Sequence, residues 1–278
     1  MDPYSSAPRR ARGPSALAGL VFIAVISGVQ APAPTSPAGA QEAAGAREPA
    51  PVDGIDVSHF NHDVDWAQVA AAGKRFAYIK ATEGVDSADP SFEKNWRGAQ
   101  AATLARGAYH FYVTEDDPQA QADFFIASVP CSDHGELIPV VDVEIVGHGT
   151  PSGWPQGLGR FLDLLEAHFG VRPMIYTEPN FWNARVGDAA AFGAYPLWVA
   201  EYGVDEPQVP KGWTSWTVWQ HNDRATVPGI DVDTDLNRLA PGLDLDAVRL
   251  PAASEPQSAP TAPQPEASPS EVSPHDHR

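Results

Sequence analysis

The chain has 278 residues, of which 36 are acidic and 18 are basic, so its formal net charge at pH 7 is −18. Phosphate contacts need a basic surface, so this charge excludes sequence-independent binding to nucleic acid and argues against stable association with an anionic membrane. The single cysteine excludes an internal disulfide, so packing must stabilise the fold, and the length allows a sizeable core.

The first 40 residues have the composition of an export signal. Three arginines within the first 12 residues precede an apolar run over residues 16–29, and small residues follow as far as Ala40. A positive start, a short apolar run and a small-x-small exit are typical of a signal peptide, so we expect cleavage near Ala40 and a periplasmic or extracellular protein. A retained anchor is the less favoured alternative, because a membrane span needs about 20 apolar residues. Residues 41–51 would be a linker.

Five predicted strands follow, and each precedes a predicted helix. Asp65, Asp89 and Asp117 stand where an N-cap accepts a backbone N–H, and a proline follows the last two. A fourth helix is expected over residues 157–169, and a shorter one after the fifth strand. This alternation indicates parallel strands joined by crossover helices. The strands are expected over residues 52–60, 75–82, 107–113, 137–145 and 172–177.

The pattern changes in the last third of the chain. Residues 195–202, 215–221 and 229–239 are strand-like, with Pro- and Gly-rich connections and no convincing helix between them. We therefore predict an α/β fold: a modified TIM-like barrel of about five β/α units followed by three β-strands, in a single domain over residues 52–250. An open doubly wound sheet is the alternative, but no Gly-rich phosphate loop follows a strand. Residues 251–278 are rich in Pro, Ser and Glu and are expected to be disordered.

Acidic residues stand at the expected carboxyl ends of several strands. Asp142 and Glu144 lie two apart in the stretch LIPVVDVEIVG, so their side chains share one face of a strand. Asp56 lies on the first strand and Asp235 near the last, and these strands become neighbours if the barrel closes. Four clustered carboxylates cannot all ionise normally, so at least one pKa should be raised. A glycosidase needs such a protonated acid beside an ionised one.

Aromatic residues and histidines flank the same strand ends. Their flat apolar rings could stack on sugar rings, and the histidines could bind a carboxylate or a hydroxyl group. The competing interpretation is that the aromatic rings fill the core and that the histidines are structural. The candidate substrate contacts are Tyr112, Tyr176, Trp198, Tyr202, Trp219, His59 and His110.

Nine short motifs follow one another between Gly54 and about Leu239. They are GIDVSHFN…DW, YIKATEG, DPSF, GAYHFY, PVVDVE, IYT, LWVAEY, VWQH and DLN. In this order the motifs resemble glycoside hydrolase family 25, the Chalaropsis-type lysozymes or N-acetylmuramidases. The resemblance implies a barrel of five strand–helix units and three further strands, in agreement with the pattern above.

The resemblance also implies a reaction and a role for each acid. The reaction is cleavage of the β-1,4 bond between N-acetylmuramic acid and N-acetylglucosamine in peptidoglycan. Glu144 matches the general acid, Asp142 the acid that orients or stabilises the substrate's N-acetyl group, and Asp56 and Asp235 two supporting acids. The resemblance implies retention of configuration, with the acetamido group as nucleophile, but the spacing of Asp142 and Glu144 leaves retention and inversion both open. We expect a monomer that acts on peptidoglycan glycan strands and needs no metal ion or cofactor.

Several alternatives stay open at this point. Asp231, Asp233 and Asp235 alternate, and the choice of Asp235 depends on the Leu-Asn pair that follows it. The same run suggests a calcium loop, but it lacks the glycine at position 6 and the glutamate at position 12. A divalent-metal hydrolase would want histidines at ligand spacing, and no H-x-x-x-H pair accompanies the acids. A barrel that binds glycan without cleaving it, and a glycosidase for another N-acetylated glycan, are the remaining rivals.

Overall fold

A closed barrel is the centre of the structure, a computed structural model that describes residues 50–130 and 137–251. Within these residues the strands are β1 (Asp53–Val57), β2 (Phe76–Glu83), β3 (Ser87–Ala88), β4 (Ala105–Phe111), β5 (Val140–Asp142), β6 (Met174–Thr177), β7 (Leu197–Ala200), β8 (Val218–Ala225) and β9 (Thr234–Leu239). β1 pairs with both β2 and β9, which closes the barrel, and β3 extends the sheet beyond β2. The predicted barrel is therefore confirmed.

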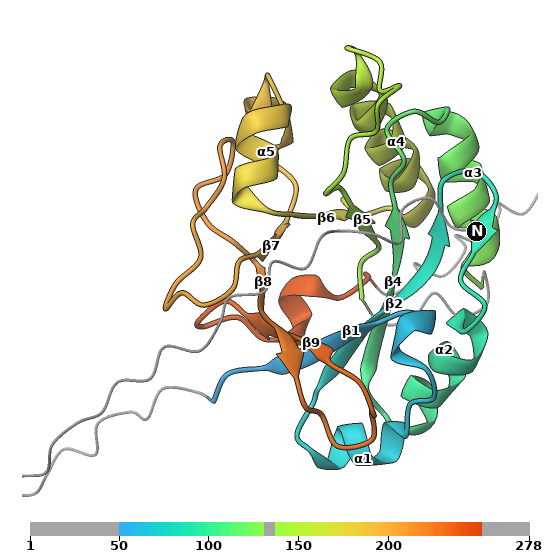
Figure 1. Cartoon of the computed structure of the whole chain (residues 1–278), viewed down its shortest axis with the longest axis vertical. Helices are drawn as coiled ribbons and strands as arrows, with labels where there is room; N and C mark the ends of the chain where they lie inside the picture. Colours follow the sequence, from blue (N-terminus) through green and yellow to red (C-terminus); the bar gives the residue numbers. More distant parts are fainter. Residues whose placement is uncertain (1–49, 131–136, 252–278) are drawn as a thin grey trace, which may run out of the picture. The chain divides into compact units, whose positions relative to one another are not determined.

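The direction of the strands changes at the end of the chain. Pairing is parallel from β1 through β2, β4, β5, β6 and β7 to β8. β9 is antiparallel to both β8 and β1. No α-helix lies between β7 and β9, as predicted, and the long connection between β7 and β8 covers the outside of those strands instead (Figure 1).

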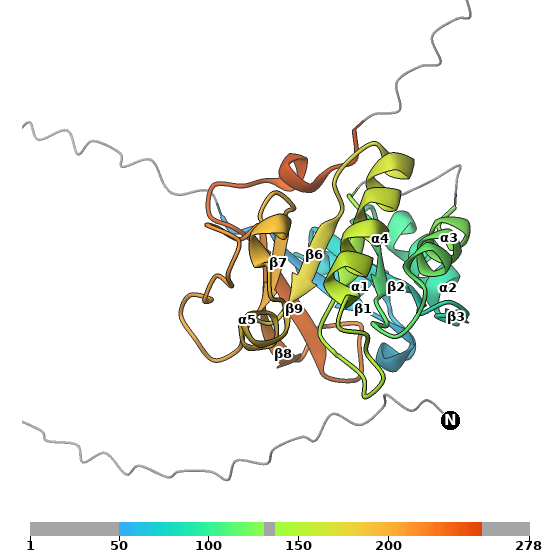
Figure 2. The same ribbon diagram turned by 90° about the horizontal axis from the view of Figure 1, so that it is seen from above.

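In the described part of the chain, each of the first five strand–helix units contributes one α-helix. They are α1 (Trp66–Ala71), α2 (Phe92–Ala101), α3 (Pro118–Ser128), α4 (Trp154–Phe169) and α5 (Pro179–Arg185), and short 3₁₀ turns occur at His59–Asn61, Ala189–Phe192 and Leu245–Val248. Figures 1 and 2 show α2, α3 and α4 grouped along one side of the barrel. Each of these helices returns the chain to the start of the next parallel strand.

Two of the predicted N-caps are confirmed and one is wrong. Asp65 accepts from the backbone N–H of Gln68 at 3.1 Å, and Asp117 caps α3 in the same way. Asp89, in contrast, does not cap α2, which begins after Ser91. Its carboxylate instead bonds the Ser91 and His59 backbone N–H groups and the His59 ring, so it ties the first loop to the second.

The alternation of side chains along the strands separates two apolar layers. The layer inside the barrel includes Phe76, Tyr78, Val140, Met174, Tyr176, Trp198 and Val218. The layer between the sheet and the helices includes Ile55, Ile79, Val141, Ile175, Phe125, Phe161 and Leu162. Gly107 keeps the interior open for a ring, because a Cβ there would lie 2.4 Å from Tyr78. Any residue on a strand therefore faces either the interior or the helices.

Some expectations about the chain ends lie outside the described residues. These are the export signal over residues 1–40, the linker up to residue 49 and the tail beyond Pro251. Among the helices that the structure describes, none has the length and apolar character needed to cross a bilayer. Several strands are shorter than predicted, and the largest difference is at residues 137–145, where only the three-residue β5 is regular strand.

Candidate active site

Four acids meet at one end of the barrel. Asp56 lies on β1 opposite Asp235 on β9, in antiparallel register. Asp142 is the last residue of β5, and Glu144 follows two residues later. Because β9 runs opposite to β1, its first residues reach the end of the barrel where the parallel strands finish. The structure therefore brings together the four acids that the sequence analysis selected.

Burial is the main cause of the abnormal acidity of this cluster. It raises the pKa of Asp142 well above the usual value, and the neighbouring Glu144 charge raises it further. Burial raises the pKa of Glu144 from 4.5 to about 7, with Glu178 the next cause. Burial, and then repulsion from Asp56, raises the pKa of Asp235 to about 8. The expected raised pKa is thus present in the structure, and protons remain in the cluster near neutrality.

One lysine partly offsets the negative charge of the acids. Lys80 lies on β2, is 9% exposed, and lowers the pKa of both Asp142 and Glu144. Its ammonium group is 2.5 Å from the carboxylate of Glu83 and 4.9 Å from the centre of the Phe111 ring. Because Glu83 shares this cation, Lys80 cannot neutralise the whole cluster.

Asp56 is the acid with the most side-chain donors. Its Oδ1 accepts from Gln220 Nε2 at 2.9 Å and from Asn237 Nδ2 at 2.6 Å. The Asn237 carbonyl oxygen in turn accepts from the indole N–H of Trp198 at 2.9 Å, which fixes the orientation of that amide. Burial still raises the pKa of Asp56, but both amides lower it. Hydrogen bonds to the charged form make Asp56 the member best suited to stay ionised.

Asp142 has the opposite environment. Among the described residues, its buried Oδ1 has no hydrogen-bond partner. An ionised oxygen without a partner is costly in a buried site, so this environment favours the protonated acid. Asp56 and Asp142 therefore differ in the form that their surroundings favour, although both lie in one cluster.

Three of the predicted aromatic contacts belong to the interior face of the barrel. Tyr176 and Trp198 lie side by side, with their ring centroids 5.1 Å apart, and both are almost fully buried. Tyr202 follows β7 and is 37% exposed, so its ring remains accessible from solvent. The hydroxyl groups of Tyr176 and Tyr202 both donate to Gln220. Of these three, Tyr202 is the one that a substrate could reach directly.

Three other predicted contacts lie on the opposite face of the sheet, and this corrects the sequence analysis. Tyr112 packs against Phe161 of α4, with ring centroids 5.3 Å apart. His110 is fully buried between Thr82 and Gln121, which bond its two ring nitrogens, and burial lowers its pKa to about 3. Trp219 lies under the β7–β8 connection and donates to the Glu201 carbonyl. All three side chains pack away from the acids, so a structural role replaces the expected substrate contact.

His59 remains at the mouth of the barrel. It follows β1, its Nδ1 lies 2.8 Å from the buried carboxylate of Asp89, and its side chain is 35% exposed. Its ring lies 4.0 Å from that of Phe60, which is 56% exposed. Asp89 also raises the pKa of Tyr109, as do three acids of the cluster, so this rim adjoins the acidic site.

Gln220 and Asn237 were not predicted as site residues, and Tyr109 was one of the aromatic residues at the strand ends but not one of the selected substrate contacts. Tyr109 pairs with Val140 on β5, an interior residue on the same face as Asp142. Strand alternation from Asp142 could have identified Tyr109, because in-register neighbours point to the same side of a sheet. Gln220 and Asn237 gave no comparable signal, because their role depends on partners far away in the sequence.

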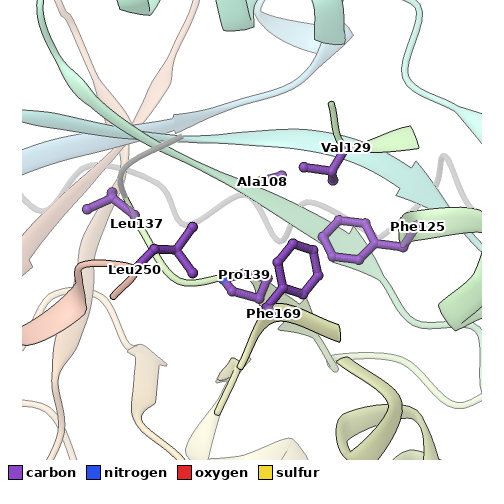
Figure 3. Close-up of a pocket in the computed structure, with 7 residues that line it drawn as sticks. All are labelled: Ala108, Phe125, Val129, Leu137, Pro139, Phe169 and Leu250. Carbon is purple, nitrogen blue, oxygen red and sulfur yellow. The ribbon is translucent and has the colours of Figure 1, made fainter. Parts of the chain in front are cut away.

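Three further observations concern a possible metal site, the neighbouring aspartates and a hollow beside β4. Within the described residues, no group of three or more His, Cys, Asp or Glu side chains could hold a metal ion. Asp231 and Asp233 are exposed, whereas Asp235 faces inward. A small apolar hollow lies on the helix side of β4 (Figure 3). Its lining residues are Ala108, Phe125, Val129, Leu137, Pro139, Phe169 and Leu250.

Comparison with known proteins adds independent findings. The family described as Glycosyl hydrolases family 25 matches residues 55–230. The chain is 36% identical over 201 residues to Lysozyme M1 of Streptomyces globisporus, a match that covers 68% of this chain and 67% of the relative. It is 36% identical to the N,O-diacetylmuramidase of Chalaropsis sp, over 62% of this chain and 88% of that one. The structure of the bacterial lysozyme from Streptomyces coelicolor matches with a TM-score of 0.64 at 35% identity, over 68% of this chain and 92% of that chain.

Proposed function

The chain belongs to family 25 of the glycosyl hydrolases, and from this membership we propose that it is a peptidoglycan hydrolase of the lysozyme type. It cleaves the β-1,4 bond between N-acetylmuramic acid and N-acetylglucosamine. The observation that carries this proposal is the cluster of buried carboxylates at one end of the barrel, in which Glu144 has a pKa of about 7. The leaving sugar oxygen must receive a proton, and a carboxylic acid that is still protonated near neutrality can donate it.

Glu144 is the general acid in this proposal. It lies in the irregular segment after β5, where it is partly exposed, so a glycosidic oxygen can approach it. Its proton passes to the leaving oxygen as the bond to the anomeric carbon breaks. Positive charge then develops on the sugar ring, and the ionised Asp56 and its neighbours stabilise that charge in a site of low dielectric constant. Asp235 on β9 adds to this field once it ionises, above its raised pKa of about 8.

Asp142 orients the substrate's N-acetyl group, and the reaction proceeds with retention. In this mechanism the acetamido oxygen attacks the anomeric carbon from the face opposite Glu144, and water later opens the resulting ring. The support is the placement of Asp142 beside Glu144 at the end of β5, together with its unpartnered oxygen. Retention can be tested by proton NMR: the first product formed should have the β configuration, and an initial α product would contradict it.

Product analysis tests the proposed activity most directly. Purified sacculi are digested with the full-length chain, and the fragments are identified by mass spectrometry. Fragments with a reducing-end muramic acid are expected, whereas a reducing-end glucosamine would indicate a different bond. Glu144→Gln should abolish release while a pull-down with sacculi remains normal. If the unaltered chain bound sacculi without releasing fragments, the protein would be a non-catalytic glycan-binding barrel; release only from another N-acetylated glycan would identify a different specificity.

The N-terminal composition supports a further part of the proposal, which is export. The substrate lies outside the cytoplasmic membrane, and the first 40 residues have the charge and apolar pattern of a cleaved signal. Intact-mass measurement of the protein from the culture medium or periplasm tests this point. A mass that corresponds to loss of the residues up to about Ala40 is expected, and an uncleaved chain in the membrane fraction would contradict it.

A further inference from the structure

Gln220 links the mouth of the barrel to the buried Asp56. Its Oε1 accepts from the hydroxyl of Tyr176 at 2.9 Å and from the hydroxyl of Tyr202. Its Nε2 donates to Asp56 Oδ1 at 2.9 Å. Gln220 itself is 3% exposed, so water cannot replace these partners easily. The side chain thus connects a solvent-accessible tyrosine to an acid of the cluster.

Asp56 and the two tyrosines together fix which way the amide points. A glutamine amide can be turned so that either its oxygen or its nitrogen faces a neighbour. Burial raises the pKa of both Tyr176 and Tyr202, so these hydroxyl groups keep their protons and act as donors. The ionised Asp56 carboxylate can only accept, so the Gln220 NH₂ group must face it, and the Gln220 oxygen then accepts from the two tyrosine hydroxyl groups. The opposite orientation would place an oxygen against the carboxylate.

We propose that Gln220 is a positioning residue for the acid cluster. Held by Tyr176 and Tyr202, it keeps Asp56 ionised, and the negative charge of Asp56 helps Glu144 to retain its proton. The inference rests on the proposed function, and in it one neutral side chain influences which of the acids are protonated. Gln220 touches neither the reacting bond nor the general acid in this scheme.

The surroundings of Asp56 explain why one amide matters. The charged and titratable groups around Asp56 and Glu144 are Asp235 on β9, Tyr202 after β7, Tyr176 on β6, Glu178 after β6, Asp142 at the end of β5, Tyr109 on β4, and Lys80 and Glu83 on β2. The acids outnumber the single cation in this set, so the protons settle on whichever carboxyls are least stabilised as anions. The charge on Asp56 raises the pKa of both Glu144 and Asp235.

Gln220→Met tests this assignment, because methionine has a similar length and no amide. Asp56 loses one of its two side-chain amide donors, so it should take up a proton at a higher pH, by about one pH unit. Glu144 titrates where Asp56 is already ionised, so the alkaline limb should stay in place. The acid limb of the profile of kcat against pH should move to higher pH and so narrow the profile, while KM changes little. A residue that only supports the fold would lower kcat at every pH without moving either limb.

A second variant and a second readout keep the test decisive. Tyr202→Phe removes one of the two hydroxyl groups that orient the amide, and it should narrow the profile in the same sense but less. Gln119→Met, at a half-buried position of α3 where the side chain bonds Asp123 and Arg160, is the matched control and should leave the profile unchanged. Carbon-13 NMR of the Asp56 carboxyl group in full-length Gln220→Met gives an answer that does not depend on activity. An upward move of the Asp56 midpoint supports the proposal, whereas an unmoved midpoint overturns it.

The proposed function and this inference fail in different ways. If the unaltered chain releases no fragments from sacculi, the proposed function fails, and the NMR titration still decides the role of Gln220. If the unaltered chain is active and the limbs of Gln220→Met and Tyr202→Phe coincide with those of the unaltered chain, only the inference about Gln220 is wrong.

Discussion

Replacing Glu144 by glutamine should make the barrel more stable at alkaline pH while it removes activity. Glu144 has a pKa of about 7 in the folded chain against an ordinary value of 4.5. Between these two pH values the folded chain holds a proton that the unfolded chain has released, so the contribution of Glu144 to stability falls as pH rises. Above pH 7 the full cost is present, and the difference in pKa corresponds to about 3 kcal/mol. Glutamine carries no charge at either pH and avoids this cost.

Urea unfolding followed by tryptophan fluorescence measures this effect. At pH 8 the free energy of unfolding of Glu144→Gln should exceed that of the unaltered chain by about 3 kcal/mol, and at pH 4 the two should nearly coincide. Glu206→Gln, in the exposed β7–β8 connection, is the matched control and should give the same small difference at both pH values. A gain for Glu144→Gln that is equal at pH 4 and pH 8, or a loss at pH 8, would refute the assignment of a strained buried charge to Glu144.

Three further predictions concern residues around the acids. Lys80→Met removes the cation that lowers the pKa of Glu144, so the alkaline limb of the kcat–pH profile should move to higher pH; an unmoved limb would contradict this electrostatic role. Asp235→Asn should lower kcat by at least about tenfold, whereas Asp233→Asn, at an exposed position, should leave it nearly unchanged; equal losses would contradict the choice of Asp235. Tyr112→Phe should keep kcat/KM for sacculi within about twofold, because this ring packs against α4, and a large rise in KM would place Tyr112 in the substrate site.

The barrel could be predicted from the sequence because the patterns that indicate it are local and repeated. Each β/α unit carries a strand pattern, a helix and a polar start such as Asp65 or Asp117, and the loss of helices after β6 and α5 is visible as a change in pattern. The antiparallel direction of β9 was not predicted, because alternation with a period of two is the same in either direction. The length of β5 was overestimated because buried residues such as Leu137 and Val143 continue the apolar pattern in irregular backbone.

The site was predicted as far as strand geometry alone can go. Closure of the barrel places Asp56 beside Asp235 and both near Asp142, and this follows once the strand order is known. To predict which face of the sheet a ring lies on, the register of its strand must also be known, and this is why Tyr112 was misplaced. The network of Gln220 could not be predicted in the same way, because its partners come from three different strands or loops and an amide has no charge pattern of its own.

Direct titration of Glu144 tests the central claim of this account, which is that crowding in the closed barrel keeps one acid protonated near neutrality. Carbon-13 NMR of side-chain carboxyl groups in the full-length chain, with Glu144→Gln used to assign the signal, gives its midpoint. A midpoint near 7 is expected, because burial and the neighbouring acids raise the pKa of Glu144. A midpoint at the ordinary value of 4.5 would show that the four carboxyls do not share one pocket and would contradict the account.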